Sequence, residues 1–243
     1  MKELVDKIKN KQRITARTFN VLTLIAGILA FAPFVDGHFL SGAWALAFVG
    51  IFLTISFFVL TMMFARRARK MDNLKTGEKL LVHLQLSDEM LKTYADELKR
   101  YYKERNTALM WIVGIFFAII GGAMLFFMEG DERGGFALII ISIVAIIFFV
   151  SKFFPWYFYR KNLKGDKQIM IGEKYAYFNG YFHNWDYPLS GLSKVKQIKQ
   201  PFYGLHLVYY YTDLTWRHTH EIKIPLPKDF DVKPIISHLK LAN

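Results

Sequence analysis

Two histidines in the C-terminal part of the chain, His218 and His220, have the residue type and spacing of metal ligands. Residues two apart in a β-strand point to the same face of a sheet, so the two imidazoles would lie side by side. A structural metal site takes three or four protein ligands. The third ligand would have to come from His183, His206 or Asp213 through folding. We therefore favour a polar strand face that binds no metal.

Asp186, His183 and Ser190 are close enough in the sequence to suggest a hydrolytic trio. No Gly-x-Ser-x-Gly turn surrounds the serine, and residues of these types are common in turns. The chain also lacks a Walker loop, a dinucleotide-binding glycine pattern and a His-Glu-x-x-His motif. It has no cysteine, which excludes thiolate catalysis, disulfides and iron-sulfur ligation. We predict a non-catalytic protein that needs no cofactor.

Basic residues that follow the apolar runs, together with two on a predicted strand, are candidate contacts for anionic lipid headgroups. Each lysine or arginine near an anionic surface contributes about 1 kcal/mol of attraction. The alternative is that these charges only determine membrane topology. The candidate headgroup contacts are Arg66, Arg67, Arg69, Lys70, Arg160, Lys161, Lys164, Lys194 and Lys196.

Four long apolar runs without Asp, Glu, Lys or Arg must position these charges. At a rise of about 1.5 Å per residue, each can cross a hydrocarbon core of roughly 30 Å, the shorter ones with help from flanking residues. The first run is too long for the apolar part of a signal peptide, and a second run follows it. Short connections join the runs into two antiparallel hairpins. The predicted spans are residues 18–35, 43–65, 107–128 and 134–151.

The distribution of charge predicts how these spans are oriented. The connections at residues 36–42 and 129–133 hold a single basic residue, Arg133, and the remaining 31 of the 32 lysines and arginines lie on the other side. Both termini should therefore be cytoplasmic. The net charge of +12 then reflects topology and contact with an anionic leaflet, with no nucleic acid as partner.

The segment between the two hairpins is predicted to begin with a basic linker and to contain a strand and a helix. Leu80 to Leu86 alternates apolar and polar residues, as a strand does. Ser87 is a good helix N-cap, and no Gly or Pro follows before Thr107. We expect one long helix whose amphipathic first part packs on the C-terminal domain and whose second part enters the membrane.

The C-terminal region is rich in strand and turn signals. Asn179-Gly180 joins two aromatic runs and accepts the positive φ angles of a tight hairpin turn. Asp229 or Asp231 is expected to cap a final amphipathic helix. The predicted strands are residues 167–171, 175–178, 181–185, 191–199, 205–211 and 215–224.

Three short segments carry a resemblance to a known family. They are VHLQLSDEM at residues 82–90, YAYFNGYFHNW at 175–185 and KIPLPKDF at 223–230. Together with the intervening hairpin, they resemble the YcxB-like bacterial membrane proteins. The resemblance implies a pleckstrin-homology-like domain, an antiparallel β-barrel or sandwich closed by a C-terminal helix, in a bacterial cytoplasmic membrane. The extra N-terminal hairpin departs from that family, and the family supplies no catalytic motif.

These elements predict an α-helical membrane protein with four transmembrane helices and a cytoplasmic α+β domain. Its expected parts are an N-terminal segment with the first hairpin, a cytoplasmic connection, a second hairpin and a β-domain, at residues 1–65, 66–106, 107–154 and 160–243.

The function that we expect is a membrane-anchored binding or regulatory module that recruits a protein or an anionic lipid at the inner leaflet. The rival is a subunit of a channel or transporter, which an oligomer of this chain could form. Transporters usually place ionisable groups inside the bilayer, and none lies in these four spans. The aromatic run Tyr209 to Tyr211 could stack on bases, but alternate aromatic residues of a sheet more often build its core.

Overall fold

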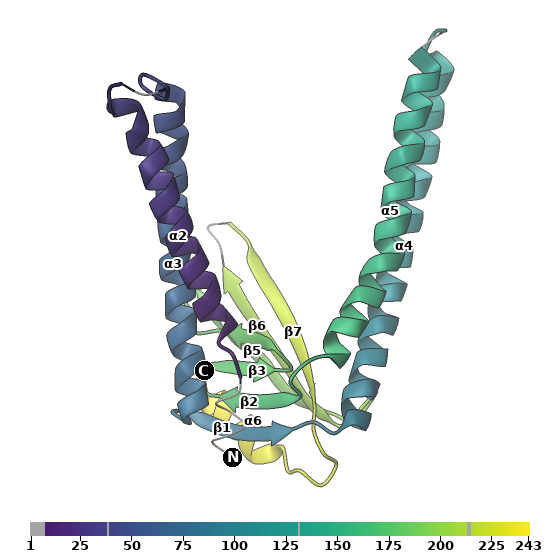
Figure 1. Ribbon diagram of the computed structural model, residues 1–243. Coiled ribbons are helices and arrows are strands. Elements are labelled where there is room, and N and C mark those ends of the chain that lie inside the picture. The colour runs from purple at the N-terminus through teal and green to yellow at the C-terminus, as the bar shows by residue number, and fades with distance from the viewer. Residues whose placement is uncertain (1–7, 38, 131, 213–214) are drawn as a thin grey trace.

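The computed structural model describes residues 8–37, 39–130, 132–212 and 215–243. Two helical hairpins diverge from a β-domain that lies at their common base, so that the molecule has the outline of a V (Figure 1). Four helices are long and apolar enough to cross a membrane, and most side chains of their apolar parts are exposed in this single chain. These surfaces suit a lipid environment.

The first hairpin consists of α2 (Lys11–Phe31), the short 3-10 helix η1 (Ala32–Phe34) and α3 (Trp44–Thr76). The two long helices pack tightly at Gly50, where an added Cβ would lie 2.6 Å from the Ala30 Cα. Helix α3 ends at Gly77, whose φ of 85° is the left-handed conformation that glycine adopts without strain.

The second hairpin consists of α4 (Asp88–Phe127) and α5 (Glu132–Leu163). The Ser87 side chain caps α4 by accepting a hydrogen bond from the Met90 N–H at 3.2 Å. Helix α4 continues without a break from the amphipathic segment into the apolar one, as the sequence predicted. Its buried Leu91 joins the core of the β-domain, and the Tyr94 ring packs edge-on against Phe178 at 4.8 Å between centroids.

The first sheet contains four antiparallel strands in the order β1-β2-β3-β4. They are β1 (Leu80–Gln85), β2 (Gln168–Gly172), β3 (Tyr175–Phe178) and β4 (Tyr181–Asn184). Strand β1 precedes the second hairpin in sequence and β2 follows it, yet the two pair directly, for example His83 with Met170. The second hairpin is therefore an insertion between two neighbouring strands.

The second sheet contains β5 (Ser190–Ile198), β6 (Gly204–Thr212) and β7 (Arg217–Pro225) in that order. In the described part of the chain, no strand pairs with a strand of the other sheet, so the domain is a sandwich of two open sheets. The C-terminal helix α6 (Lys233–Ala242) packs against it. The buried core between these elements includes Ile169, Ile171, Phe178, Trp185, Leu205, Leu207, Ile224 and Leu239.

Several local signals in the sequence are confirmed. The predicted turn at Asn179 and Gly180 has φ angles of 47° and 91° and joins β3 to β4. Asp231 accepts a hydrogen bond from the Lys233 N–H at 3.0 Å at the start of α6, although the residue at the cap position is Val232.

The basic segment after the second span differs from the expectation. We expected a linker from residue 66, but residues 66–76 continue α3 without a break. The physical reason is that Arg, Lys, Met, Ala and Leu are good helix formers, and no Gly or Pro occurs before Gly77. Helix α5 likewise continues past its span to Leu163, through Pro155. Both hairpins therefore extend as helices to the β-domain.

The close contact at Gly50 predicts a site-specific loss of stability. Replacing Gly50 with Ala places a methyl group against the Ala30 backbone, so α2 and α3 must move apart. We expect the thermal unfolding midpoint of the detergent-solubilised protein to fall by several degrees. Gly122→Ala is the matched control, because a Cβ there meets nothing within 4 Å. Equal midpoints for the two variants would contradict this packing.

Candidate functional site

Two of the predicted headgroup contacts, Arg67 and Lys70, bind the β-domain. The Arg67 Nη2 donates a hydrogen bond to the Phe182 carbonyl oxygen at 3.1 Å, and its guanidinium lies over the Phe182 ring. The Lys70 Nζ lies 2.7 Å from an Asp186 carboxylate oxygen and also donates to the Asp186 carbonyl oxygen. These contacts form because α3 continues as a helix past β4. They attach the first hairpin to the first sheet.

The remaining predicted headgroup contacts are exposed but do not form one cluster. On α5, the Arg160 guanidinium lies over the Trp156 ring, and the Lys161 Nζ lies over the Tyr181 ring of β4. On β5, Lys194 and Lys196 pair with Val208 and His206 of β6. The exposed residues of this set are Arg66, Arg69, Arg160, Lys161, Lys164, Lys194 and Lys196.

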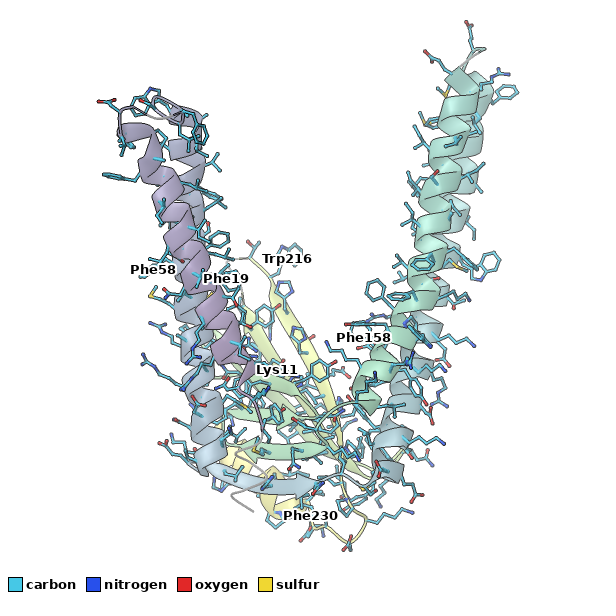
Figure 2. All side chains as sticks on the ribbon, in the orientation of Figure 1. Lys11, Phe19, Phe58, Phe158, Trp216 and Phe230 are labelled. Carbon is cyan, nitrogen blue, oxygen red and sulfur yellow. The ribbon has the colours of Figure 1, made fainter. Side chains whose placement is uncertain are left out.

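A cavity of about 530 Å³ lies where the second hairpin meets the two sheets. This volume is within the range of pockets that hold small molecules. Its walls come from α4, from α5, from β3 and β4 of the first sheet, from β7 of the second sheet, and from Phe202 in the connection between β5 and β6. Figure 2 shows Phe158, one of these wall residues, on the side of the second hairpin that faces the sheets. The aromatic wall residues are Tyr94, Tyr101, Tyr102, Phe158, Phe178, Tyr181 and Phe202.

Two acidic and two basic side chains also line this cavity, and the acidic ones have partners beyond it. A Glu97 carboxylate oxygen lies 2.7 Å from an Arg100 guanidinium nitrogen, and a Glu221 oxygen lies 3.2 Å from the His206 Nε2. Arg105 lies over the Tyr101 and Tyr102 rings. Among the described residues, neither Arg105 nor Lys223 has an acidic partner. The cavity therefore offers two available positive charges to an anion.

A second, mainly apolar crevice of about 310 Å³ runs between α4 and α5. It shares three lining residues with the polar cavity, namely Tyr102, Arg105 and Phe158. Its other walls belong mostly to the apolar part of the hairpin: Leu109, Met110, Val113, Ile147, Val150 and Phe154. The two spaces together suit a molecule with a polar end and an apolar end.

The imidazole of His183 forms part of the cavity wall. Its Nδ1 lies 3.3 Å from the Tyr209 hydroxyl oxygen, a hydrogen bond whose direction depends on the histidine tautomer. Burial, together with the smaller effects of the nearby Arg67 guanidinium and of His220, lowers the pKa of His183 to about 4. At neutral pH, His183 is therefore an uncharged polar group in the wall.

The residues of the candidate metal site and of the candidate hydrolytic trio contact other partners in the structure. His218 and His220 do share a face of β7, where both stack against the Tyr211 ring at 5.1 and 5.4 Å between centroids. Among the described residues, no three His, Asp or Glu side chains gather as metal ligands. His206 pairs with Glu221, and Asp213 lies outside the described residues.

The three residues of the proposed hydrolytic trio have separate partners. The Ser190 hydroxyl donates to the Tyr187 carbonyl oxygen and accepts from the Tyr187 N–H. Asp186 pairs with Lys70, whereas His183 contacts Tyr209. These contacts give each side chain a local structural role.

Sequence reasoning missed the cavity residues on α4. A signal for them was present, because Arg105 and Asn106 lie directly before the apolar part of α4 and follow two tyrosines. A positive charge beside aromatic rings at this position is typical of the membrane interface. The pattern alone does not reveal that β7, more than a hundred residues later, covers the same place.

Comparison with known proteins adds no relative to this description. No protein-family model, curated protein or solved structure matches the chain. The resemblance to YcxB-like proteins therefore stays a prediction, and the function has to be inferred from the geometry.

The attachment of α3 to β4 can be tested at Lys70. Among the described residues, replacing Lys70 with Met leaves the Asp186 carboxylate with the longer contact to Lys174, at 3.8 Å, as its one ion pair. A hydrogen bond to a charged group contributes roughly 1.5 to 3 kcal/mol, so we expect a lower thermal unfolding midpoint. Arg69→Met is the matched control on the exposed side of the same helix. If both variants lose the same stability, Lys70 does not attach the domain.

The lowered pKa of His183 predicts acid sensitivity. Between about pH 6.5 and pH 4, the unfolded chain binds a proton at this imidazole and the folded chain does not, so stability falls as the pH is lowered through this window. Thermal unfolding measured from pH 7.5 to pH 4.5 should show a smaller loss for His183→Gln than for the wild type. His238→Gln, on the exposed side of α6, should keep the wild-type loss. An unchanged acid sensitivity in His183→Gln would refute this assignment.

Proposed function

We propose that this chain is a non-catalytic, membrane-anchored binding module that holds an anionic lipid at the base of its second hairpin. The observation that carries the proposal is the sharing of Tyr102, Arg105 and Phe158 by the polar cavity and the apolar crevice. A lipid headgroup would enter the cavity, and the acyl chains would follow the crevice along α4 and α5. A single class of ligand thus accounts for both spaces.

The chemistry of the cavity favours an anionic headgroup over a neutral one. Arg105 and Lys223 supply positive charge, and an arginine can donate two parallel hydrogen bonds to a phosphate. The tyrosine hydroxyl groups of the wall add neutral donors, while the aromatic rings exclude water and so strengthen these contacts. Exposed Lys161 and Arg160 lie on the adjoining turn of α5, where they would attract anionic lipids to the site.

The setting of this site is part of the proposal. The excess of Lys and Arg on the side of the β-domain supports a cytoplasmic location for that domain and for both termini. The division into a four-stranded and a three-stranded antiparallel sheet with a C-terminal helix supports a pleckstrin-homology-like domain. We further propose membership of the YcxB-like family and a bacterial cytoplasmic membrane, on the three sequence segments that resemble that family.

The rival function, a channel or transporter subunit, has less support. The helices pack as two separate pairs, α2 with α3 and α4 with α5, and these pairs diverge (Figure 1). A path through the membrane would therefore have to be built from several copies of the chain. The four spans carry no ionisable group that could bind an ion or a proton along it.

Lipid retention by the purified full-length protein tests the proposal. Native mass spectrometry in mixed detergent and lipid should show that the protein retains phosphatidylglycerol in preference to phosphatidylcholine. The double variant Arg105→Gln, Lys223→Gln should lower this preference roughly thirtyfold, since each of the two charges contributes about 1 kcal/mol. Lys103→Gln is the control for loss of a surface charge, because Lys103 is exposed on α4 outside the cavity.

Two results would contradict an anionic lipid in this cavity. One is an unchanged preference for phosphatidylglycerol in the double variant. The other is an equal loss in Lys103→Gln, which would indicate a diffuse surface charge effect. Co-purification of a protein that is lost in the double variant, without any lipid preference in the wild type, would instead assign the cavity to a protein partner.

A further inference from the structure

The end of the second sheet where β6 ends and β7 begins exposes several large apolar side chains. Trp216, just before β7, is 71% exposed, and Leu189, just before β5, is 69% exposed. Tyr211, near the end of β6, is also exposed. The Thr212 N–H donates to the Leu189 carbonyl oxygen at 2.8 Å, which holds these segments together at one end of the sheet. We call Leu189, Tyr211, Thr212 and residues 215–217 the sheet tip.

The sheet tip lies between the two hairpins, at the level of their apolar parts. In Figure 2, Trp216 is found at about the height of Phe58 and Phe19 of the first hairpin. It lies farther from the base of the molecule than Phe158 and Lys11 do (Figure 2). Phe58 precedes Arg66 by eight residues, which is about 12 Å along a helix. Trp216 is therefore on the membrane side of the basic residues at the end of the second apolar run.

The residue types of the sheet tip match those of protein segments that sit in a membrane interface. Trp and Tyr are enriched where headgroups meet acyl chains. Arg217 lies over the Tyr210 ring, 3.7 Å from its centroid, so its charge is held next to this aromatic group. Arg217 is the one side chain among the described residues of the sheet tip that is charged at neutral pH, and a positive charge favours anionic headgroups.

We infer that the sheet tip inserts into the membrane leaflet on the side of the β-domain, with Trp216 and Leu189 at the boundary between headgroups and acyl chains. The bilayer is the occupant that the geometry supports, because the exposed Trp216 lies at the level of the apolar parts of helices that are long and apolar enough to span a membrane (Figure 2). A water-soluble partner would have to enter between the hairpins at a depth that lipid already occupies.

Insertion of the sheet tip would give β7 two separate contacts with lipid. Residues 219–223 of the same strand line the polar cavity, only a few residues from Trp216. A β-strand is stiff along its length, so the depth of Trp216 would fix the height of this cavity wall relative to the membrane. The inference does not rest on a lipid in the cavity, since the sheet tip is a separate surface.

Because the chain has no cysteine, a single introduced thiol reports on the depth of the sheet tip. Trp216→Cys, labelled with the polarity-sensitive dye NBD, would be reconstituted as the full-length protein into nanodiscs of phosphatidylglycerol and phosphatidylcholine. Lys228→Cys, an exposed position in the connection between β7 and α6, carries the same dye as the control. Lipids with a nitroxide on the upper part of the acyl chain should quench the label at position 216 at least threefold more than the label at 228. Its emission should also be blue-shifted relative to the control.

Two outcomes would overturn the inference. The first is that both labels are equally quenched by a water-soluble quencher and equally insensitive to the nitroxide lipids. The second is a blue-shifted label at position 216 that nitroxide lipids do not quench, which would show that protein covers the sheet tip. Leu189→Cys provides an independent site on the same surface if Trp216→Cys lowers the unfolding midpoint, and it should give the same result.

Discussion

The antiparallel pairing of β1 with β2 is the interaction on which the rest of the structure depends. It joins residues 80–85 to residues 168–172 across the whole second hairpin. The His83 Nε2 lies 2.9 Å from the Gln168 side-chain oxygen, and the Leu86 N–H donates to the Lys167 carbonyl oxygen. Closing a long disordered insertion would cost conformational entropy. Here α4 and α5 are antiparallel and bring the two strands together. Formation of the helical hairpin therefore favours the β1–β2 pairing, and the pairing favours the hairpin.

The first hairpin is held to the same domain in a different way. It contributes no strand, but the extension of α3 beyond the apolar segment buries Met71 and Leu74 against Met170 and Tyr175. The contacts of Arg67 and Lys70 with β4 add directional hydrogen bonds at this place. With both hairpins attached at their bases, the second sheet is fixed between them. This position brings β7 next to α4 and forms the cavity.

Much of this architecture could be predicted from local patterns. Some features depend only on residues that are near in sequence: the charge-free apolar runs, the Ser87 cap and the Asn179-Gly180 turn. The predictions of four long apolar helices, of the long α4 and of the β3–β4 turn are therefore confirmed. The contacts of the Arg67 and Lys70 side chains with the β-domain could not be predicted, because they form only when α3 continues as a helix and β4 lies beside it. The cavity was missed for the same reason, since only the tertiary fold places Arg105 and Lys223 in the wall of the same cavity.

The register of β1 on β2 is tested most directly by a disulfide across the ladder. Gln85 and Gln168 are cross-strand partners, and the natural chain has no cysteine that could compete. Gln85→Cys, Gln168→Cys should form an intramolecular disulfide in native membranes under mild oxidation, as judged by mass spectrometry of linked peptides. Gln85→Cys paired with Lys174→Cys, which lies beyond the far end of β2, should not. No bond in the first pair, or equal yields in the two pairs, would show that the second hairpin is not closed by this strand pairing.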